Sequence, residues 1–546
     1  MAYPTTHAVL NQPPALEGHN VFLSDRVLQE ALGREGAGWA RESARVLGDA
    51  AGGEAIRWGF QANENPPRLR TFDRFGNRID EVEFHPAYHA LMKLGVNAGV
   101  HALPWRDAKP GAHAARAALF MLLTQTEAGV GCPLSMTYSV VPALRLQPEI
   151  AQEWEPRFTS LEYDAGLQPA EKKRGALCGM AMTEKQGGSD VRANTTRATP
   201  IGAPGPGREY ELVGHKWFCS APMCDAFLTL AQTEKGLSCF FLPRFLPDGT
   251  RNRIAIQRLK DKLGNRSNAS SEIELQGAWA RMVGEEGRGV PTILEMVSHT
   301  RLDCVIGATA GTRLAVTQAI HHATYRAAFG KKLVEQPLMQ NVLADLAVES
   351  EAATTLMMRL ARAYDEGQTE PAARLFARVA TAVAKYWTCK RMPAVAAEAL
   401  ECLGGNGYVE ESVMPRLYRE APLNSIWEGS GNVICLDVLR ALSREPGSVE
   451  AFLGEVRKAR GEDTALDRAV ATLEHDFDDL ETLEVRARRV VERMALVLQA
   501  SLLLQHGDAK VAAAFCRSRL DGDQGLAFGT LPAGTDFAHI IERARP

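Results

Sequence analysis

One stretch of strand-like sequence separates two long helical stretches, and this order limits what the chain can fold into. From about 179 to 275, short apolar runs such as residues 226–231 and 237–242 are separated by Gly, Pro and Asp, which is typical of buried strands. On either side, residues 86–144 and 291–443 are rich in strong helix formers. The chain is therefore predicted to be mainly α with a central β domain.

The length of 546 residues is too great for one hydrophobic core and predicts several domains or layers. Pro and Gly within residues 445–448 indicate a linker, and the sequence after it is charge-rich and helical. We expect four domains, which are a helical domain (1–178), a β domain (179–281), a second helical domain (282–443) and a C-terminal helical domain (444–546).

Composition and charge narrow the functional classes. The net charge of −4 gives no global basic field for nucleic acid, so any such partner needs a local patch. The ten cysteines form no CxxC pairs, which indicates free thiols in a reducing compartment. The first residues lack a signal-peptide pattern, and the apolar run 494–504 is too short to cross a bilayer. We expect a cytoplasmic protein without a membrane partner.

Metal and nicotinamide chemistry find little support in the sequence. His85 and His89 have i, i+4 spacing, but Pro86 lies between them and no third ligand is evident. His321 and His322 are adjacent and cannot share one helix face. No GxGxxG follows a strand. The prediction is therefore no metal site and no Rossmann NAD site.

Two motifs of the β region could hold a flat or anionic group. Residues 182–190 read Met-Thr-Glu-Lys-Gln-Gly-Gly-Ser-Asp, and the paired glycines let backbone N–H groups approach such a group. A double glycine alone favours the alternative, a simple turn. In residues 214–220 a strand ends in an aromatic pair, where Trp217 either belongs to the core or walls a planar ring.

Three further motifs lie in the second helical region. Arg326 and Phe329 have i, i+3 spacing, which would place them on one helix face, with Gly330 ending that helix; the alternative is an exposed Arg beside a core Phe. Residues 402–408 read Cys-Leu-Gly-Gly-Asn-Gly-Tyr. Glu428 stands between an aromatic residue and a glycine, a setting that favours a carboxyl with a raised pKa, although an ordinary loop carboxylate would read the same.

Taken in order, these five motifs resemble the acyl-CoA dehydrogenase family over about residues 85–441. The resemblance implies a helical domain, a β-barrel-like domain and a helical bundle, with FAD between the last two and completed by a neighbouring subunit. Glu428 would be the catalytic base that removes the α-proton of an acyl-CoA, while flavin takes the β-hydride. The implied FAD contacts are Met182, Thr183, Gly187, Gly188, Ser189, Trp217, Phe218, Ser220, Arg326, Phe329, Gln336, Gly404, Gly405, Trp427, Gly429, Ser430 and Asn432.

The sequence departs from the family pattern at three informative positions. Ser430 replaces the usual threonine two residues after the base, and Glu401 replaces the usual glutamine before the Leu-Gly-Gly segment, which puts one cross-subunit FAD contact in doubt. In the isovaleryl-CoA branch the base lies just before a helix arginine, but Thr300 precedes Arg301 here. Glu428 is therefore the only base that the family pattern supplies.

A second resemblance covers nearly the whole chain and weakens after about Arg444. Residues 11–14 (Asn-Gln-Pro-Pro), 84–89, 262–270 and 424–432 look like the AidB-type flavoproteins of the adaptive response to DNA alkylation. This implies a homotetramer that binds double-stranded DNA and keeps weak dehydrogenase activity. The DNA-binding candidates are Arg440, Arg486, Arg489, Arg493, Arg517 and Arg519.

The functional alternatives stay open at this point. In the C-terminal segment, acidic residues lie near the arginines and balance their charge. The charge pattern alone therefore favours a solvated helix face over a DNA-binding surface. An ordinary metabolic acyl-CoA dehydrogenase is one alternative function. A flavin-dependent detoxifier of alkylating agents is another.

Overall fold

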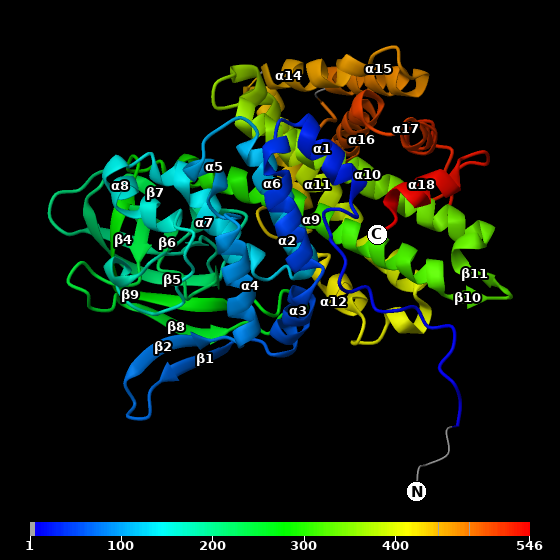
Figure 1. Ribbon diagram of the computed structural model, residues 1–546. Coiled ribbons are helices and arrows are strands. Elements are labelled where there is room, and N and C mark those ends of the chain that lie inside the picture. The colour runs from blue at the N-terminus through cyan, green and yellow to red at the C-terminus, as the bar shows by residue number, and fades with distance from the viewer. Residues whose placement is uncertain (1–5, 446, 480) are drawn as a thin grey trace, which may run out of the picture.

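The computed structural model describes residues 6–445, 447–479 and 481–546, and it has the expected order of helical, β and helical regions. Figure 1 shows the β domain at one side of the molecule and the long helices α9, α10 and α11 at the other. This confirms the acyl-CoA dehydrogenase type of fold. Within the described part of the chain, no helix is both long and apolar enough to cross a membrane.

The N-terminal region is helical except for one hairpin that the sequence analysis missed. Strands β1 (Arg68–Phe72) and β2 (Arg78–Glu83) pair antiparallel and contact β8 of the β domain (Figure 1). Their charged, half-exposed sequences resemble a loop, because little apolar surface is buried there. The helices are α1 (Arg26–Arg34), α2 (Arg41–Ala51), α3 (Glu54–Glu64), α4 (Pro86–Asn97), α5 (Leu103–Arg106), α6 (Ala112–Thr126), α7 (Gly131–Leu144) and α8 (Pro148–Phe158).

A seven-stranded sheet forms the β domain. The apolar runs expected as strands are confirmed as β6 and β7, which pair antiparallel and are buried over most of their length. The long strands β5 and β9 pair along most of their length, with two irregularities in register, the second between Lys216 and Cys219. The strands are β3 (Cys178–Ala181), β4 (Arg197–Pro200), β5 (Glu209–Ser220), β6 (Ala226–Thr233), β7 (Gly236–Pro243), β8 (Ile254–Leu259) and β9 (Ser270–Val283).

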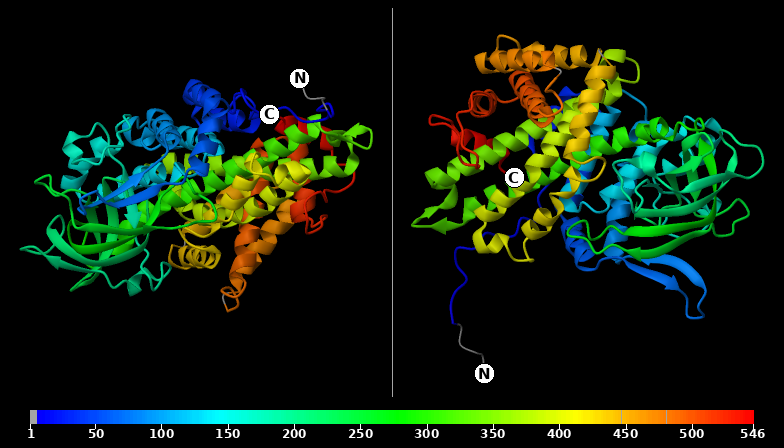
Figure 2. Two further views of the ribbon diagram at one scale, coloured as in Figure 1. Left: turned by 90° about the horizontal axis from the view of Figure 1, so that it is seen from below. Right: turned by 180° about the vertical axis from the view of Figure 1, so that it is seen from behind.

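Long helices build the second helical region and run past the end of the sheet (Figure 2). Helix α9 packs against α6 and α7 of the N-terminal region as well as against α10 and α11. Its residues 302–320 are almost entirely buried, since neighbours surround the helix. The helices are α9 (Gly289–Tyr325), α10 (Pro337–Glu366), α11 (Pro371–Cys402), α12 (Val413–Glu420) and α13 (Gly431–Arg444).

The prediction that Arg326 and Phe329 share a helix is wrong. Helix α9 ends at Tyr325, and Arg326 is extended. The next residues form a two-stranded hairpin, β10 (Ala327–Ala328) and β11 (Lys331–Lys332). Phe329 and Gly330 make its turn with φ of 53° and 78°, values that a right-handed helix excludes. The two side chains therefore do not share a helix face.

The C-terminal helices pack onto the second helical region. Two expectations fall partly outside the described residues. Pro446 belongs to the expected linker, and helix α14 begins directly after it, at Gly447. Leu480 was the expected start of a long helix, and that helix begins later, at Ala487. Helices α14 and α16 cover α11, while α16 and α18 cover α10. The bounds are α14 (Gly447–Val456), α15 (Thr464–Asp478), α16 (Ala487–His506), α17 (Ala509–Phe515) and α18 (Phe537–Ala544).

Helix α18 is tied to α10 by a buried ion pair and to the N-terminal region by a half-exposed one. Arg543, 8% exposed, lies 2.8 Å from Glu351 of α10 and also pairs with Glu30 of α1. Arg313 of α9 donates to the carbonyls of Ser24 and Ala544. The first and the last helix are therefore held to the same central helices.

Candidate active site and cofactor-binding segments

Glu428 lies in the loop between α12 and α13, against the middle of α9. Its Oε2 is 2.7 Å from Oγ1 of Thr300, which donates to it. Burial raises the pKa of the Glu428 carboxyl, while the Thr300 hydrogen bond and the charges of Arg301 and Lys385 oppose that rise. The raised pKa expected from the sequence is therefore present, and its main cause is burial.

The backbone around Glu428 is held in an uncommon conformation. Glu428 has φ of 57°, in the left-handed region that non-glycine residues rarely occupy. The ammonium of Lys385 donates to the carbonyls of Trp427 and Gly429, and the guanidinium of Arg301 donates to the carbonyl of Glu428. These three hydrogen bonds fix the backbone and thereby the direction of the Glu428 side chain. Lys385 was not predicted from the sequence, because it is one of several basic residues in an alanine-rich helix.

A buried ion pair shapes the motif at the end of β3. Nζ of Lys216 lies 2.8 Å from Oε1 of Glu184, and both side chains have no exposed surface. Thr195 and Thr196 donate to the same carboxylate, and Lys216 also donates to the Leu230 carbonyl. Burial would raise the pKa of Glu184, but the Lys216 charge and these hydrogen bonds lower it. The pair fixes the loop that carries the expected FAD contacts 182–189.

Gly187 and Phe218 of the β domain present open surface beside the paired-glycine loop. At Gly188 a Cβ atom would lie 2.5 Å from Oγ1 of Thr183, whereas Gly187 faces open space at φ of 149°. The backbone N–H of Trp217 donates to the Thr183 carbonyl, so the motifs 182–190 and 214–220 lie side by side. The Phe218 ring is 49% exposed, which is high for an aromatic side chain at a strand end. These residues fit FAD.

Two partly buried groups, Cys132 and Lys262, lie where α7 meets the β domain. Burial raises the pKa of the Cys132 thiol, at the start of α7, to about 12, and the charge of Glu428 adds to the rise. Lys262 donates to the Asn268 carbonyl and to Oγ of Ser270, and burial lowers its pKa to about 8. Cys132 was not predicted as a site residue, because it stands in no sequence motif, and Lys262 was noted only as part of the segment 262–270 that carries the family resemblance.

Five of the expected FAD contacts, Arg326, Phe329, Gln336, Gly404 and Gly405, lie far from Glu428. Thr300 and Tyr325 are 25 residues apart on α9, which corresponds to roughly 37 Å at about 1.5 Å per residue. Beyond Tyr325 the Phe329 side chain is fully exposed. Gln336 donates to the Ala328 carbonyl and so braces the hairpin. Gly404 and Gly405 face open space. One chain therefore cannot bring both sets of contacts to one flavin.

Two of the expected FAD contacts in the Glu428 loop are hydrogen-bonded to other residues of the chain. The indole N–H of Trp427 donates to Asn424, and Asn432 accepts from Arg488. Ser430 is exposed at the start of α13. Gly429 has φ of 110°, which only glycine adopts without strain.

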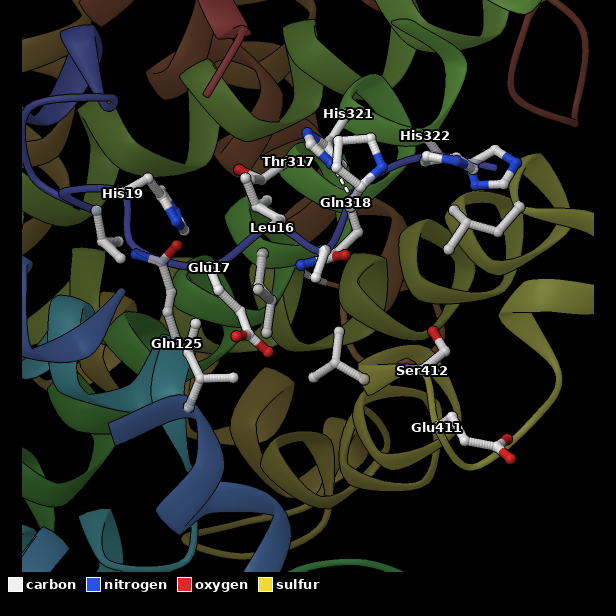
Figure 3. A pocket seen from close by; sticks show the side chains of 18 of the residues that line it. Leu16, Glu17, His19, Gln125, Thr317, Gln318, His321, His322, Glu411 and Ser412 are labelled. Carbon is white, nitrogen blue, oxygen red and sulfur yellow. Dashed lines mark hydrogen bonds between the residues drawn. The ribbon is translucent and has the colours of Figure 1, made fainter. Parts of the chain in front are cut away.

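A separate cavity of about 600 Å³ lies beneath an N-terminal strap, which we define as residues 11–19. Figure 3 shows Leu16, Glu17 and His19 of the strap beside Thr317 and Gln318 of α9. The other walls come from α2, α3, α6 and residues 403–416. Because this cavity lies at the C-terminal half of α9, it is distinct from the surroundings of Glu428.

The expected DNA-binding arginines differ in their availability. Arg519 is only 5% exposed in its side chain and pairs with Asp345 and Glu349, so it cannot reach a phosphate and is no longer a candidate. Arg486 lies 2.8 Å from Asp476, which also pairs with Arg493. The arginines that stay exposed are Arg440, Arg489 and Arg517, of which Arg517 lies 3.5 Å from Asp523.

The histidines that the sequence placed near one another have structural roles. His85 caps α4 and His89 contacts the hydroxyl of Tyr163. Within residues 6–445, 447–479 and 481–546, no three metal-ligating side chains come together.

Comparison with known proteins identifies related families over most of the chain. Three family models match, the adaptive response protein AidB N-terminal domain over residues 11–165 and the middle and C-terminal domains of acyl-CoA dehydrogenase over 179–278 and 287–443. AidB of Escherichia coli strain K12 is 47% identical over 95% of this chain and 96% of its own. Acyl-CoA dehydrogenase family member 11 of Caenorhabditis elegans is 30% identical over 90% and 85%.

A solved structure extends the comparison to three dimensions. The Caenorhabditis elegans protein ACDH-11 in complex with C11-CoA has a TM-score of 0.87 at 27% identity, over 95% of this chain and 94% of its own. Fold and site thus define the class of acyl-CoA dehydrogenases, FAD-dependent oxidoreductases that act on CH–CH groups. Within that class the chain belongs to the AidB family.

Proposed function

We propose that the chain forms a homotetramer that carries FAD and dehydrogenates an acyl-CoA weakly, with Glu428 as the base. The observation that carries this proposal is the position of Glu428. It is a carboxyl with a raised pKa, and hydrogen bonds from Lys385 and Arg301 to the carbonyls around it fix the backbone that carries it. A base in such surroundings accepts a proton more readily than a solvated carboxylate.

In the proposed reaction, the ionised Glu428 takes the α-proton of the thioester. Thr300 donates to Glu428 Oε2 and orients the carboxylate before the transfer. Bound FAD supplies the acceptor for the hydride that leaves the β-carbon. After the transfer the neutral carboxyl is favoured by burial, which lowers the cost of the protonated state.

The assembly follows from the separation of the FAD contacts. The residues around the β domain and Glu428 would hold the flavin of their own subunit. Arg326, Phe329 and Gln336, which follow the end of α9 roughly 37 Å from Thr300, and Gly404 and Gly405, which follow α11, would reach the FAD of a neighbour. The full exposure of Phe329 and the 80% exposure of Tyr408 support an interface at this end of the bundle.

The test is direct. The purified protein should be yellow with FAD bound, and acyl-CoAs that include a C11 chain should bleach the flavin absorbance without oxygen. We choose the C11 chain because the ACDH-11 structure holds C11-CoA. A colourless protein that does not take up FAD would refute the proposal. Bleaching without DNA affinity would favour an ordinary metabolic dehydrogenase.

Binding of double-stranded DNA under alkylation stress is a second proposed function. It rests on the AidB family membership and on the exposed arginines Arg440 of α13 and Arg489 of α16, two helices that pack together. Within the described residues, neither has a carboxylate within 4 Å. Contacts of this kind reach phosphates and carry no base code. A flavin-dependent detoxifier of alkylating agents would instead turn over without DNA.

A further inference from the structure

The strap, residues 11–19, joins two segments that lie far apart in the sequence. Nδ2 of Asn11 donates to the Ala327 carbonyl at 2.8 Å, and Oδ1 of Asn11 accepts from the Ala327 N–H at 2.7 Å. The Asn11 side chain thus bonds both polar groups of one residue in strand β10, as a neighbouring strand would. The hairpin that presents Arg326 and Phe329 is therefore held from outside.

The strap also reaches the glycine-rich segment after α11. Oε1 of Gln12 accepts from Nδ2 of Asn406 at 3.2 Å. Arg326 donates to the Asn11 carbonyl at 2.7 Å, and the Pro14 carbonyl lies 2.8 Å from Nε2 of His321. Two consecutive residues therefore bridge the hairpin and the segment of Gly404 and Gly405.

The backbone of Asn11 explains why this residue suits the position. Its φ is 58°, and asparagine tolerates the left-handed region better than other residues with a side chain. Glycine would keep the backbone but lose both side-chain hydrogen bonds. Alanine would lose the bonds and add strain.

We propose that Asn11 is a positioning residue for the FAD of a neighbouring subunit. It sets the hairpin of Arg326 and Phe329 at a fixed distance from Gly404 and Gly405. This inference rests on the proposed function, in which these segments bind a neighbour's cofactor. Fixing them before FAD arrives lowers the ordering cost of binding.

The experiment compares FAD affinity in full-length variants. Apoprotein of the wild type, of Asn11→Gly and of Asn11→Ala is titrated with FAD, and the quenching of flavin fluorescence gives Kd. Loss of two hydrogen bonds should raise Kd about tenfold in both variants. The matched control is Asn77→Ala, which removes an exposed side-chain bond to Asp73 in the β1–β2 turn and should leave Kd unchanged.

The outcomes separate this inference from the proposed function. A wild type that binds no FAD overturns the proposed function. A wild type that binds FAD, with Asn11→Gly and Asn11→Ala binding equally well, overturns the role of Asn11 alone. Sedimentation at the same concentration completes the test. If Asn11→Gly loses affinity only because its tetramer has dissociated, the strap stabilises the interface and the positioning role is refuted.

Discussion

The Thr300 hydroxyl lies 2.7 Å from Oε2 of Glu428 and 3.0 Å from the Val297 carbonyl. It has one proton and donates to one acceptor at a time. When Glu428 is ionised, the carboxylate is the stronger acceptor. Thr300 thus stabilises the ionised base, at the position where the isovaleryl-CoA branch would carry the base itself.

Replacing Glu428 by Gln should abolish acyl-CoA-driven bleaching of the flavin while FAD stays bound. The amide keeps the shape of the side chain but accepts no proton, so the rate should fall at least ~100-fold. Stopped-flow absorbance under anaerobic conditions measures it. Glu83→Gln, an exposed change on β2, is the control. Bleaching of Glu428→Gln at the wild-type rate would place the base elsewhere.

The bleaching rate should fall toward acid pH, with an apparent pKa above the ordinary glutamate value of 4.5. The reason is that Glu428 must be ionised to take the proton, and burial raises its pKa. Thr300→Val removes a hydrogen bond to the charged form and should move this acid limb to higher pH. Ser298→Ala, whose hydroxyl donates to the Leu294 carbonyl, is the matched control. An unmoved limb in Thr300→Val would contradict the role of Thr300.

Lys216→Met should destabilise the β domain strongly. It leaves the Glu184 carboxylate buried without its cation, a change that costs about 3–5 kcal/mol. Denaturant unfolding of the protein measures this decrease in stability. Lys185→Met, at the exposed neighbouring position of Glu184, should change stability little. Equal stability of the two variants would show that the pair does not hold the loop.

Alanine at both Arg440 and Arg489 should weaken binding to duplex DNA and lower its salt dependence. Removing one arginine–phosphate interaction reduces the log–log salt slope by about 0.9. Fluorescence anisotropy at several salt concentrations gives both quantities, with Arg70→Ala as the control. Wild-type affinity in the double variant, or salt-independent binding, would refute this surface. Truncation after 443 is a poorer test, because it uncovers α10 and α11.

The features that depend on a local residue pattern could be predicted from the sequence. Apolar runs bounded by glycine predicted β6 and β7, and the aromatic-Glu-Gly pattern predicted the buried carboxyl of Glu428. The hairpin at Phe329 was not predictable in the same way. Ala-Ala-Phe favours a helix, and the fold overrides this preference with two residues of positive φ.

Long-range pairing accounts for most of the remaining differences. Arg519 looks free in the sequence, but its partner Asp345 is 174 residues away, so local pattern cannot reveal the ion pair. Lys385 acts on a loop more than 40 residues later in the chain. Asn11 and Ala327 are 316 residues apart. Such contacts depend on topology, which periodicity does not encode.

The ion pairs of Arg543 form only late in the synthesis of the chain. Glu30 and Arg543 are 513 residues apart. At roughly 5–20 residues per second, the ribosome makes the arginine about 25–100 s after the glutamate. Glu351 is translated within that interval, 192 residues before the arginine that neutralises it. Until Arg543 is made, the junction of the first helix, α10 and α18 is therefore incomplete in the nascent chain.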